Sequence, residues 1–203
     1  MSLLDSTFTG IIMKIKTIDR EQLTRLSREL YDRALTASGK PDCVAGIASG
    51  GAFVARAMGV RPVFEVACRR PSSGRKNRSW TRRLIGGLPR WMTDRLRMAE
   101  HRWLMRRGTA TERSVAIQPE MLEFLANHQE AKVLLVDDAV DSGVTMRCVA
   151  EALRKAAPKI SILTAAITVT TEWPAMMPDV AIYRDWMLCR FPWSADYKGE
   201  DRL

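Results

Sequence analysis

One stretch of the chain, residues 132–157, constrains the fold more than any other. Four apolar residues, Val133 to Val136, are followed by two adjacent acids and a polar run that ends at Thr145. A continuous apolar run of this kind is typical of a central strand in a parallel sheet, buried on both faces. Met146 to Ala156 then has helical character. The stretch therefore predicts a strand, a polar loop over 137–145 and a helix, in that order.

The rest of the chain continues this alternation. Apolar runs predict further strands, and periodic segments between them predict helices. The predicted strands cover 12–18, 44–48, 62–68, 114–117, 160–169 and 180–183, and the main helices cover 20–38, 52–58, 120–127 and 146–156. Strands alternating with helices indicate an α/β fold with a mostly parallel central sheet flanked by helices. The length of 203 residues suits a single domain, 1–203.

Positive charge is concentrated in one segment, residues 69–113. It holds 14 of the 32 Lys and Arg residues but only three of the 23 acids, so the remainder of the chain is close to neutral. Met92, Leu96, Ala99 and Trp103 recur there at helical spacing. We therefore expect a basic helical insert, and a patch of this kind attracts phosphate as nucleotide, nucleic acid or membrane surface. The plainer alternative is a solvated helix that keeps the protein soluble.

Composition excludes several classes of protein. Hydrophobic residues make up 46% and charged residues 27%, which is ordinary for a globular domain and unlike a disordered chain. The longest apolar stretch, 162–169, is far shorter than the roughly 20 residues of a membrane helix, and we expect neither membrane insertion nor a signal peptide. The four cysteines have neither zinc-site nor disulfide-scaffold spacing, which favours reduced thiols and a cytoplasmic location.

The polar loop carries the predicted chemistry. Ligands of parallel α/β sheets bind at the carboxyl ends of the strands, and this loop also opens a helix, whose first backbone N–H groups attract phosphate. Gly143 allows close approach, while Ser142 and Thr145 add hydroxyl donors. Asp137 and Asp138 can accept hydrogen bonds from sugar hydroxyls, directly or through Mg²⁺. The residues therefore predict a sugar-phosphate site.

The run VLLVDDAVDSGVT resembles the signature of the type I phosphoribosyltransferases, in which a strand, an acidic pair and a phosphate loop follow in register. The resemblance implies a type I phosphoribosyltransferase-like fold and binding of 5-phosphoribosyl 1-pyrophosphate (PRPP). It assigns PRPP binding to Asp137, Asp138, Asp141, Ser142, Gly143, Val144 and Thr145. It also implies Mg²⁺ as cofactor, held at Asp137 and Asp138. Asp141 stands where purine-using members have their catalytic general base, although a helix N-cap would use the same residue.

A second loop extends the resemblance. About ninety residues before this run, a predicted buried strand is followed by Ala48, Ser49, Gly50 and Gly51. These residues stand at the position of the family's pyrophosphate loop. That loop often has a non-proline cis peptide bond, which would fall here between Ala48 and Ser49. Purine-using members often carry Lys or Arg where Ser49 stands, so we expect pyrophosphate to be bound also by Arg69 and Arg70.

The C-terminal stretch, with Asp185-Trp186-Met187 and Phe191-Pro192-Trp193, resembles the segment that closes the base-binding hood of xanthine–guanine phosphoribosyltransferases. The resemblance implies a small hood over 170–203 in which Trp186 stacks on the base beside Met187. An alternative is that Trp186 lies in the hood's own core. Thr168 occupies the position of a lysine that reads the purine in that subgroup, so base specificity is open.

These features predict an enzyme, a Mg²⁺-dependent phosphoribosyltransferase that joins a nitrogenous base to PRPP, with a purine-like base as first candidate. The rival prediction is a non-catalytic sensor of PRPP or nucleotides, or a nucleic-acid-binding regulator. The insert over 69–113 has three candidate roles: an enlarged lid, an oligomerisation arm or a nucleic-acid-binding element. We expect a homodimer.

Overall fold

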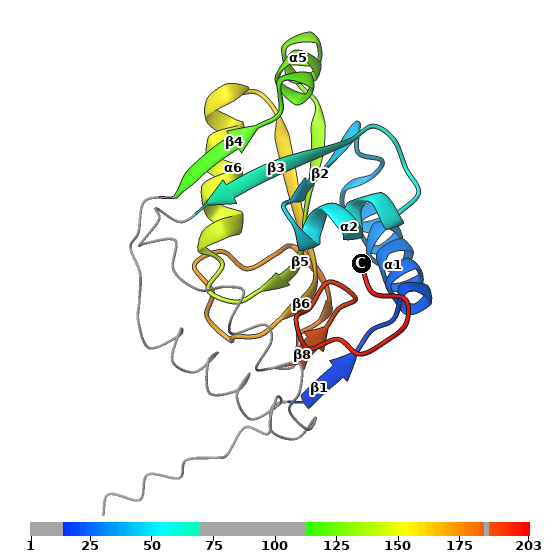
Figure 1. Ribbon diagram of the computed structural model, residues 1–203. Helices are drawn as coiled ribbons and strands as arrows, with labels where there is room; N and C mark the ends of the chain where they lie inside the picture. Colours follow the sequence, from blue (N-terminus) through cyan, green and yellow to red (C-terminus); the bar gives the residue numbers. More distant parts are fainter. Residues whose placement is uncertain (1–13, 70–112, 185–186) are drawn as a thin grey trace, which may run out of the picture.

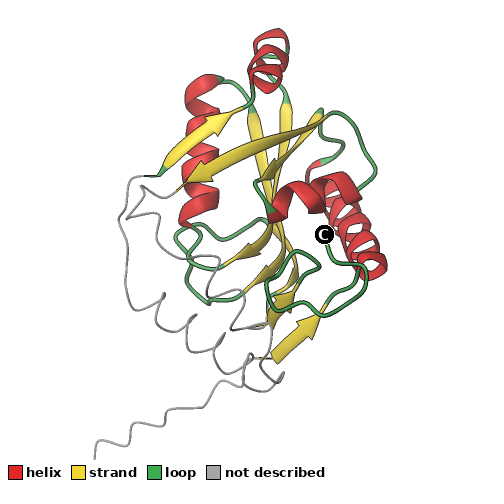
Figure 2. Cartoon of the chain, in the orientation of Figure 1, coloured by secondary structure: helices red, strands yellow, loops and turns green. Residues whose placement is uncertain are grey.

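The computed structural model describes residues 14–69, 113–184 and 187–203 (Figure 1). Within these ranges one sheet has six strands in the order β4-β3-β2-β5-β6-β7, and a second pairs β1 with β8. Figure 2 shows how helices flank the larger sheet. The elements in chain order are β1 (Lys14–Thr17), α1 (Arg20–Ser38), β2 (Cys43–Ile47), α2 (Gly50–Ala57), β3 (Val63–Arg69), β4 (Ser114–Ile117), α5 (Pro119–Asn127), β5 (Lys132–Val140), α6 (Val144–Ala156), β6 (Ser161–Val169), β7 (Val180–Tyr183) and β8 (Met187–Arg190).

The larger sheet is parallel except at one edge. Strands β3, β2, β5, β6 and β7 pair in parallel, while β4 runs antiparallel to β3. Helices α1 and α2 cover one face and α5 and α6 the other (Figure 1). The α/β fold with a mostly parallel sheet is therefore confirmed.

Strand β5 separates the two halves of the hydrophobic core. Val133 and Leu135 pack on the α5–α6 side, and Leu134 and Val136 pack on the α1–α2 side. All four are buried, as expected for a central parallel strand covered on both faces. This double burial explains why the apolar run lacks the polar alternation of an exposed strand.

Helix α1 begins and ends at the residues that its sequence indicates. Asp19 accepts a hydrogen bond of 2.7 Å from the Gln22 backbone N–H, which satisfies one of the unpaired donors of the first turn. The apolar stripe Leu23, Leu26 and Leu30 is buried against the sheet. Gly39 follows the helix with a φ of 77°, a left-handed backbone angle that glycine adopts without steric cost.

Strand β5 is longer than its sequence predicts. It runs on through the two acids to Val140 because β6 continues to pair with it, with Asp137 opposite Ala166 and Val140 opposite Val169. The predicted loop over 137–145 is therefore wrong in extent: the loop proper is 141–143. Asp137 and Asp138 lie on a strand, where the hydrogen-bonded ladder fixes their backbone.

The segment 170–203 divides between the two sheets. Strand β7 joins the larger sheet beside β6, whereas β8 pairs in parallel with β1, which precedes α1. We use "hood" below for β1 together with 187–203. An ion pair of 2.8 Å between Arg190 and Asp196 lies within it, with both side chains less than 10% exposed.

Most of the basic insert, 70–112, lies outside the described residues, as does the helix expected within it. None of the helices in the described ranges is both long and apolar enough to cross a lipid bilayer. All four cysteines carry free thiols.

Candidate phosphoribosyl site

The candidate site lies where the sheet changes winding direction. The connection from β2 leads through α2 outward to β3, whereas the connection from β5 leads through α6 outward to β6 on the other side. Because β2 and β5 are neighbours, their following loops diverge and leave a crevice at the carboxyl ends of the strands. Both predicted loops, 48–51 and 137–145, lie at this point.

The turn into α6 forms a small polar cavity of about 70 Å³. Gly143, with a φ of 70°, immediately precedes the helix, so the first N–H groups of α6 face this end of the sheet. The Arg113 guanidinium donates a hydrogen bond to the Thr145 hydroxyl across the cavity. Its lining is completed by Asp137, Ala139, Val140, Asp141, Ser142 and Met146. A cation, hydroxyls and a helix N-terminus together suit a phosphate group.

The connection from β6 to β7 holds this turn in place. The Ala175 N–H donates to the Ser142 carbonyl at 2.7 Å. Gly143 packs so closely that a Cβ added there would lie 2.6 Å from the backbone of Met176. A side chain at position 143 would therefore collide with main chain as well as oppose the left-handed φ.

The second loop begins with a cis peptide bond between Ala48 and Ser49, as the family resemblance implies. Helix α2 follows directly at Gly50. Gly50 lies against the carboxylate of Asp138, and Gly51 lies against the backbone of Val136 and Asp137. The loop and the acidic pair are therefore in contact, although about ninety residues separate them in sequence.

The acidic pair is electrostatically strained. Burial raises the pKa of Asp137 well above its usual range, and the neighbouring charge of Asp138 raises it further. Burial also raises the pKa of Asp138, although hydrogen bonds from Asp137 and Trp193 act in the opposite direction. Two carboxylates this close repel one another when both are ionised, so the pair favours a bound cation or hydroxyl donors.

Asp138 also contacts the hood. The Trp193 indole N–H donates to Asp138 Oδ2 at 3.1 Å. The indole ring is stacked between Phe53 of α2 and Phe191, with centroid distances of 4.9 and 4.8 Å. The hood therefore reaches both the acidic pair and the helix that follows the second loop.

Asp141 is exposed at the mouth of the turn into α6. The Thr170 hydroxyl, just after β6, donates to Asp141 Oδ1 at 2.5 Å. The side chain of Asp141 is therefore oriented from the neighbouring strand end, toward the side of the crevice where β6 ends.

The residues predicted to contact the base are placed in part. Thr168 is fully buried, and its hydroxyl donates to the Met187 carbonyl at 2.6 Å, which joins β6 to the hood. Its hydroxyl is thus already engaged by the protein. Trp186 lies outside the described residues, as does Arg70. Arg69 is exposed at the end of β3, opposite Ser114 of β4.

Sequence reasoning missed three contacts of this site. Arg113 is the last residue of the basic segment and directly precedes a strand, a position that could have drawn attention to it. Thr170 follows a predicted strand end, where ligand-binding residues gather. Trp193 was noted only as part of the hood motif, and its contact with Asp138 spans 55 residues, so no local pattern signals it.

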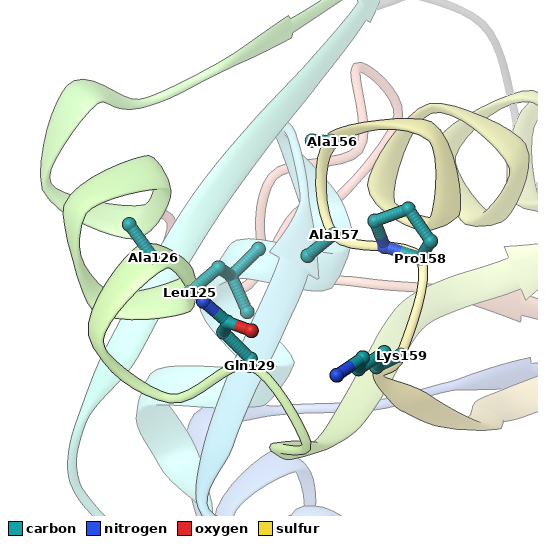
Figure 3. Close-up of a pocket in the computed structure, with 7 residues that line it drawn as sticks. All are labelled: Leu125, Ala126, Gln129, Ala156, Ala157, Pro158 and Lys159. Atoms are coloured by element: carbon teal, nitrogen blue, oxygen red, sulfur yellow. The ribbon is translucent and has the colours of Figure 1, made fainter.

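A larger cavity, of about 310 Å³, lies at the other end of the strands, where β5 and β6 begin (Figure 3). Leu125, Ala126 and Gln129, at the end of α5 and in the turn after it, face Ala156 to Lys159 at the end of α6. The cavity is therefore separate from the candidate phosphoribosyl site.

One family model matches part of this chain. Residues 106–178 match the family model described as the phosphoribosyl transferase domain. A search of curated protein sequences found no significant match.

Solved structures share the fold. A purine phosphoribosyltransferase from Pyrococcus horikoshii is 19% identical, with a TM-score of 0.57 over 94% of this chain and 100% of that one. The Helicobacter pylori xanthine-guanine-hypoxanthine phosphoribosyltransferase is 16% identical, with a TM-score of 0.55 over 90% and 95%. A hypothetical protein from Neisseria gonorrhoeae with bound ppGpp is 17% identical, with a TM-score of 0.59 over 90% of each chain.

The chain has a phosphoribosyltransferase-like α/β fold, and its residues 106–178 match the phosphoribosyl transferase domain. The described residues have the order of the type I signature, with a strand, an acidic pair and a loop that opens a helix. The predicted family resemblance is thereby confirmed.

Proposed function

We propose that this protein is a Mg²⁺-dependent phosphoribosyltransferase that transfers the 5-phosphoribosyl group of PRPP to a nitrogenous base, with a purine as first candidate. In this reaction the bond from ribose C1 to the pyrophosphate oxygen breaks, and its electron pair leaves with pyrophosphate. A ring nitrogen of the base bonds to C1, and its proton passes to a carboxylate. Arrangement of charge and exclusion of water dominate such a step.

The 5′-phosphate would bind at the start of α6. The backbone N–H groups of Gly143, Val144 and Thr145 and the Ser142 hydroxyl would donate to its oxygens. Arg113 supplies a positive charge beside Thr145. Charge-assisted hydrogen bonds from arginine to phosphate are among the stronger polar contacts in proteins, so this end of PRPP would anchor the rest.

The ribose diol would lie over Asp137 and Asp138. Their oxygens are the donor type that Mg²⁺ prefers, and Mg²⁺ usually takes one or two protein carboxylates together with substrate phosphates. Burial, and then the neighbouring charge of Asp138, raises the pKa of Asp137, and a cation bound there would stabilise the ionised carboxylate. When bound there, Mg²⁺ would neutralise charge on the pyrophosphate group. The described residues offer no group of three or more metal-ligating side chains, so substrate oxygens would complete the coordination.

Pyrophosphate would lie over the second loop. The backbone N–H groups of Ser49, Gly50 and Gly51 precede or begin α2, at the positive end of its dipole. Arg69, at the end of the adjacent strand, is the cation proposed to assist them, together with Arg70.

The base would lie between the end of β6 and the hood. Asp141, oriented by Thr170, is the proposed catalytic base that receives the proton from the ring nitrogen. Met187 would line the base pocket, with Trp186 as the stacking residue. Thr168 would act here by fixing the Met187 backbone.

The observation that carries this proposal is the contact between the two loops. Gly50 lies against Asp138 and Gly51 against Asp137. A pyrophosphate-binding loop and a diol-binding acidic pair must be adjacent, because C1 and its oxygen substituent are adjacent in PRPP. The parallel pairing of β2 with β5 brings the two loops together at the carboxyl ends of the strands.

The direct test is an assay of the purified full chain with PRPP, Mg²⁺ and a panel of purines, pyrimidines and pyridines. We expect pyrophosphate release with at least one base, and loss of release in Asp137→Asn. No turnover with any base would contradict catalysis.

A second candidate is a nucleotide sensor that keeps this pocket as a ligand switch. Two observations favour testing this sensor function. One similar structure contains bound ppGpp, and the segment 69–113 of this chain is strongly basic. PRPP or ppGpp binding without turnover would support this candidate, as would salt-dependent binding of RNA or DNA that requires the arginines of 69–113.

Three further proposals concern the whole chain. We propose that residues 1–203 form one domain, with 69–113 as an insert and 170–203 supplying β7 and most of the hood. For the insert, the lid, the oligomerisation arm and nucleic-acid binding remain the three candidate roles. We also propose a cytoplasmic homodimer, to be tested by sedimentation of the full chain.

A further inference from the structure

The hood contacts the acidic pair of the candidate site through the indole N–H of Trp193. Trp193 Nε1 donates to Asp138 Oδ2 at 3.1 Å, within the range of an ordinary N–H···O hydrogen bond. An indole N–H can only donate, so this contact requires the carboxylate to accept. Asp138 is one of the two acids proposed to hold the ribose diol.

The ring of Trp193 is itself fixed. Its plane is nearly parallel to those of Phe53 and Phe191, with interplanar angles of 15° and 3°. Phe191 is buried, and Phe53 belongs to α2. Such stacked contacts restrict the ring to one orientation, so the N–H direction is set before any ligand arrives.

Asp138 has a second close neighbour. Gly50 lies against its carboxylate so tightly that a Cβ there would overlap it. The carboxylate is therefore in contact with both the backbone of the second loop and the indole of the hood. Rotation about its Cα–Cβ bond would break one contact or collide with the other.

We propose that Trp193 is a positioning residue of the PRPP site: its indole N–H fixes the Asp138 carboxylate in the orientation that receives the ribose hydroxyls. This inference rests on the proposed phosphoribosyl function. It assigns the hood a role toward the sugar, in addition to any role toward the base.

The test distinguishes the hydrogen bond of the Trp193 indole N–H from the stacking of its ring. Trp193→Phe removes the N–H and keeps an aromatic ring between Phe53 and Phe191. Phe53→Leu is the matched control, because it removes one stacking partner and keeps the N–H. The thermal midpoint, the Kd of PRPP with Mg²⁺ by calorimetry, and the KM values of PRPP and the base are measured for the wild type and both variants.

We expect Trp193→Phe to weaken PRPP binding and raise its KM about tenfold, as for the loss of one hydrogen bond to a charged group. The KM for the base should change less than twofold. Phe53→Leu should lower the thermal midpoint while changing the KM for PRPP less than twofold, because the indole still stacks on Phe191 and its N–H keeps its direction. In an Asp138→Ala background, Trp193→Phe should have no further effect on PRPP binding, because the two residues act through one contact.

Several outcomes would overturn the inference. One is a Trp193→Phe variant that binds PRPP like the wild type, and another is equal weakening by Phe53→Leu, which would indicate a purely structural hood. If Trp193→Phe does not fold, the assigned indole N–H resonance of the wild type decides: it should shift on saturation with PRPP, and an unmoved signal would overturn the inference. Failure of the wild type to bind PRPP at all would instead overturn the proposed function.

Discussion

Gly50 and Asp138 lie in direct contact, one at the start of α2 and the other near the end of β5. This contact joins the loop proposed for pyrophosphate to the carboxylates proposed for the ribose. A side chain at position 50 would therefore disturb the site, because even the methyl group of alanine would occupy the same space as the Asp138 carboxylate.

Gly50→Ala should therefore destabilise the protein and abolish PRPP binding. Alanine favours a helix by about 1 kcal/mol over glycine, so a helical position without this contact would gain stability. The measurement is the thermal midpoint together with calorimetry of PRPP. The double variant Gly50→Ala/Asp138→Ala should recover the midpoint without recovering binding, and a higher midpoint in Gly50→Ala alone would contradict the contact.

Asp137→Asn should stabilise the ligand-free protein at neutral pH while eliminating activity. The pKa of Asp137 is higher in the folded chain than in the unfolded chain, because of burial and then Asp138. Ionisation therefore opposes folding, and stability falls as pH rises from the unfolded pKa through the folded one. Relief of about 1 kcal/mol would raise the thermal midpoint by roughly 2–4 °C.

The same variant offers an internal control through pH. Toward pH 4 Asp137 is protonated in the folded protein, so the difference in midpoint between the variant and the wild type should shrink. A difference in midpoint that grows on acidification would contradict a raised pKa of Asp137.

Arg113→Gln should raise the KM for PRPP about ten- to hundredfold, the expected loss for hydrogen bonds from a charged group to phosphate. Arg113 reaches the Thr145 hydroxyl across the proposed 5′-phosphate cavity. Arg154→Gln, an exposed arginine in the last turn of the same α6, is matched for charge and should leave the KM unchanged. Equal effects of both variants on the KM for PRPP would mean that the net charge of the protein, and not a contact of Arg113 with the phosphate, is responsible.

Asp196→Ala should lower the free energy of unfolding by about 3–5 kcal/mol, since it removes a carboxylate that pairs with the buried Arg190. Denaturant unfolding measures this difference. The exposed pair of Arg33 and Glu29 is the comparison, and Glu29→Ala should cost less than about 1 kcal/mol. Similar losses in the two variants would mean that burial of the Arg190 pair contributes nothing.

Local patterns in the sequence were sufficient to predict the described elements from β1 to β7 and the turn that opens α6, whereas strand β8 was not predicted. The buried run Val133 to Val136 and the helix stripe of Leu23, Leu26 and Leu30 each report their own environment. The sequence was insufficient for the end of β5, because pairing with β6 carries the strand through Asp137 and Asp138 against their low strand propensity.

The side-chain contacts of the site could not be predicted from the sequence alone. Arg113 reaches Thr145 over 32 residues, and Trp193 reaches Asp138 over 55. Neither separation leaves a periodic signal, because each depends on where the sheet order places its strands. The loop at Ala48 to Gly51 was found only through its likeness to a family, since a Ser-Gly-Gly turn alone has little specificity.

The pairing of β1 with β8 has a consequence for the order in which the molecule assembles and opens. Thr17 and Arg190, joined by a hydrogen bond, are 173 residues apart, and closing so long a segment is entropically unfavourable until the intervening layers have formed. The small sheet should therefore form late and open early. On warming, affinity for PRPP should decline before the far-ultraviolet circular dichroism changes, because Trp193 leaves Asp138 while the six-stranded sheet is still intact.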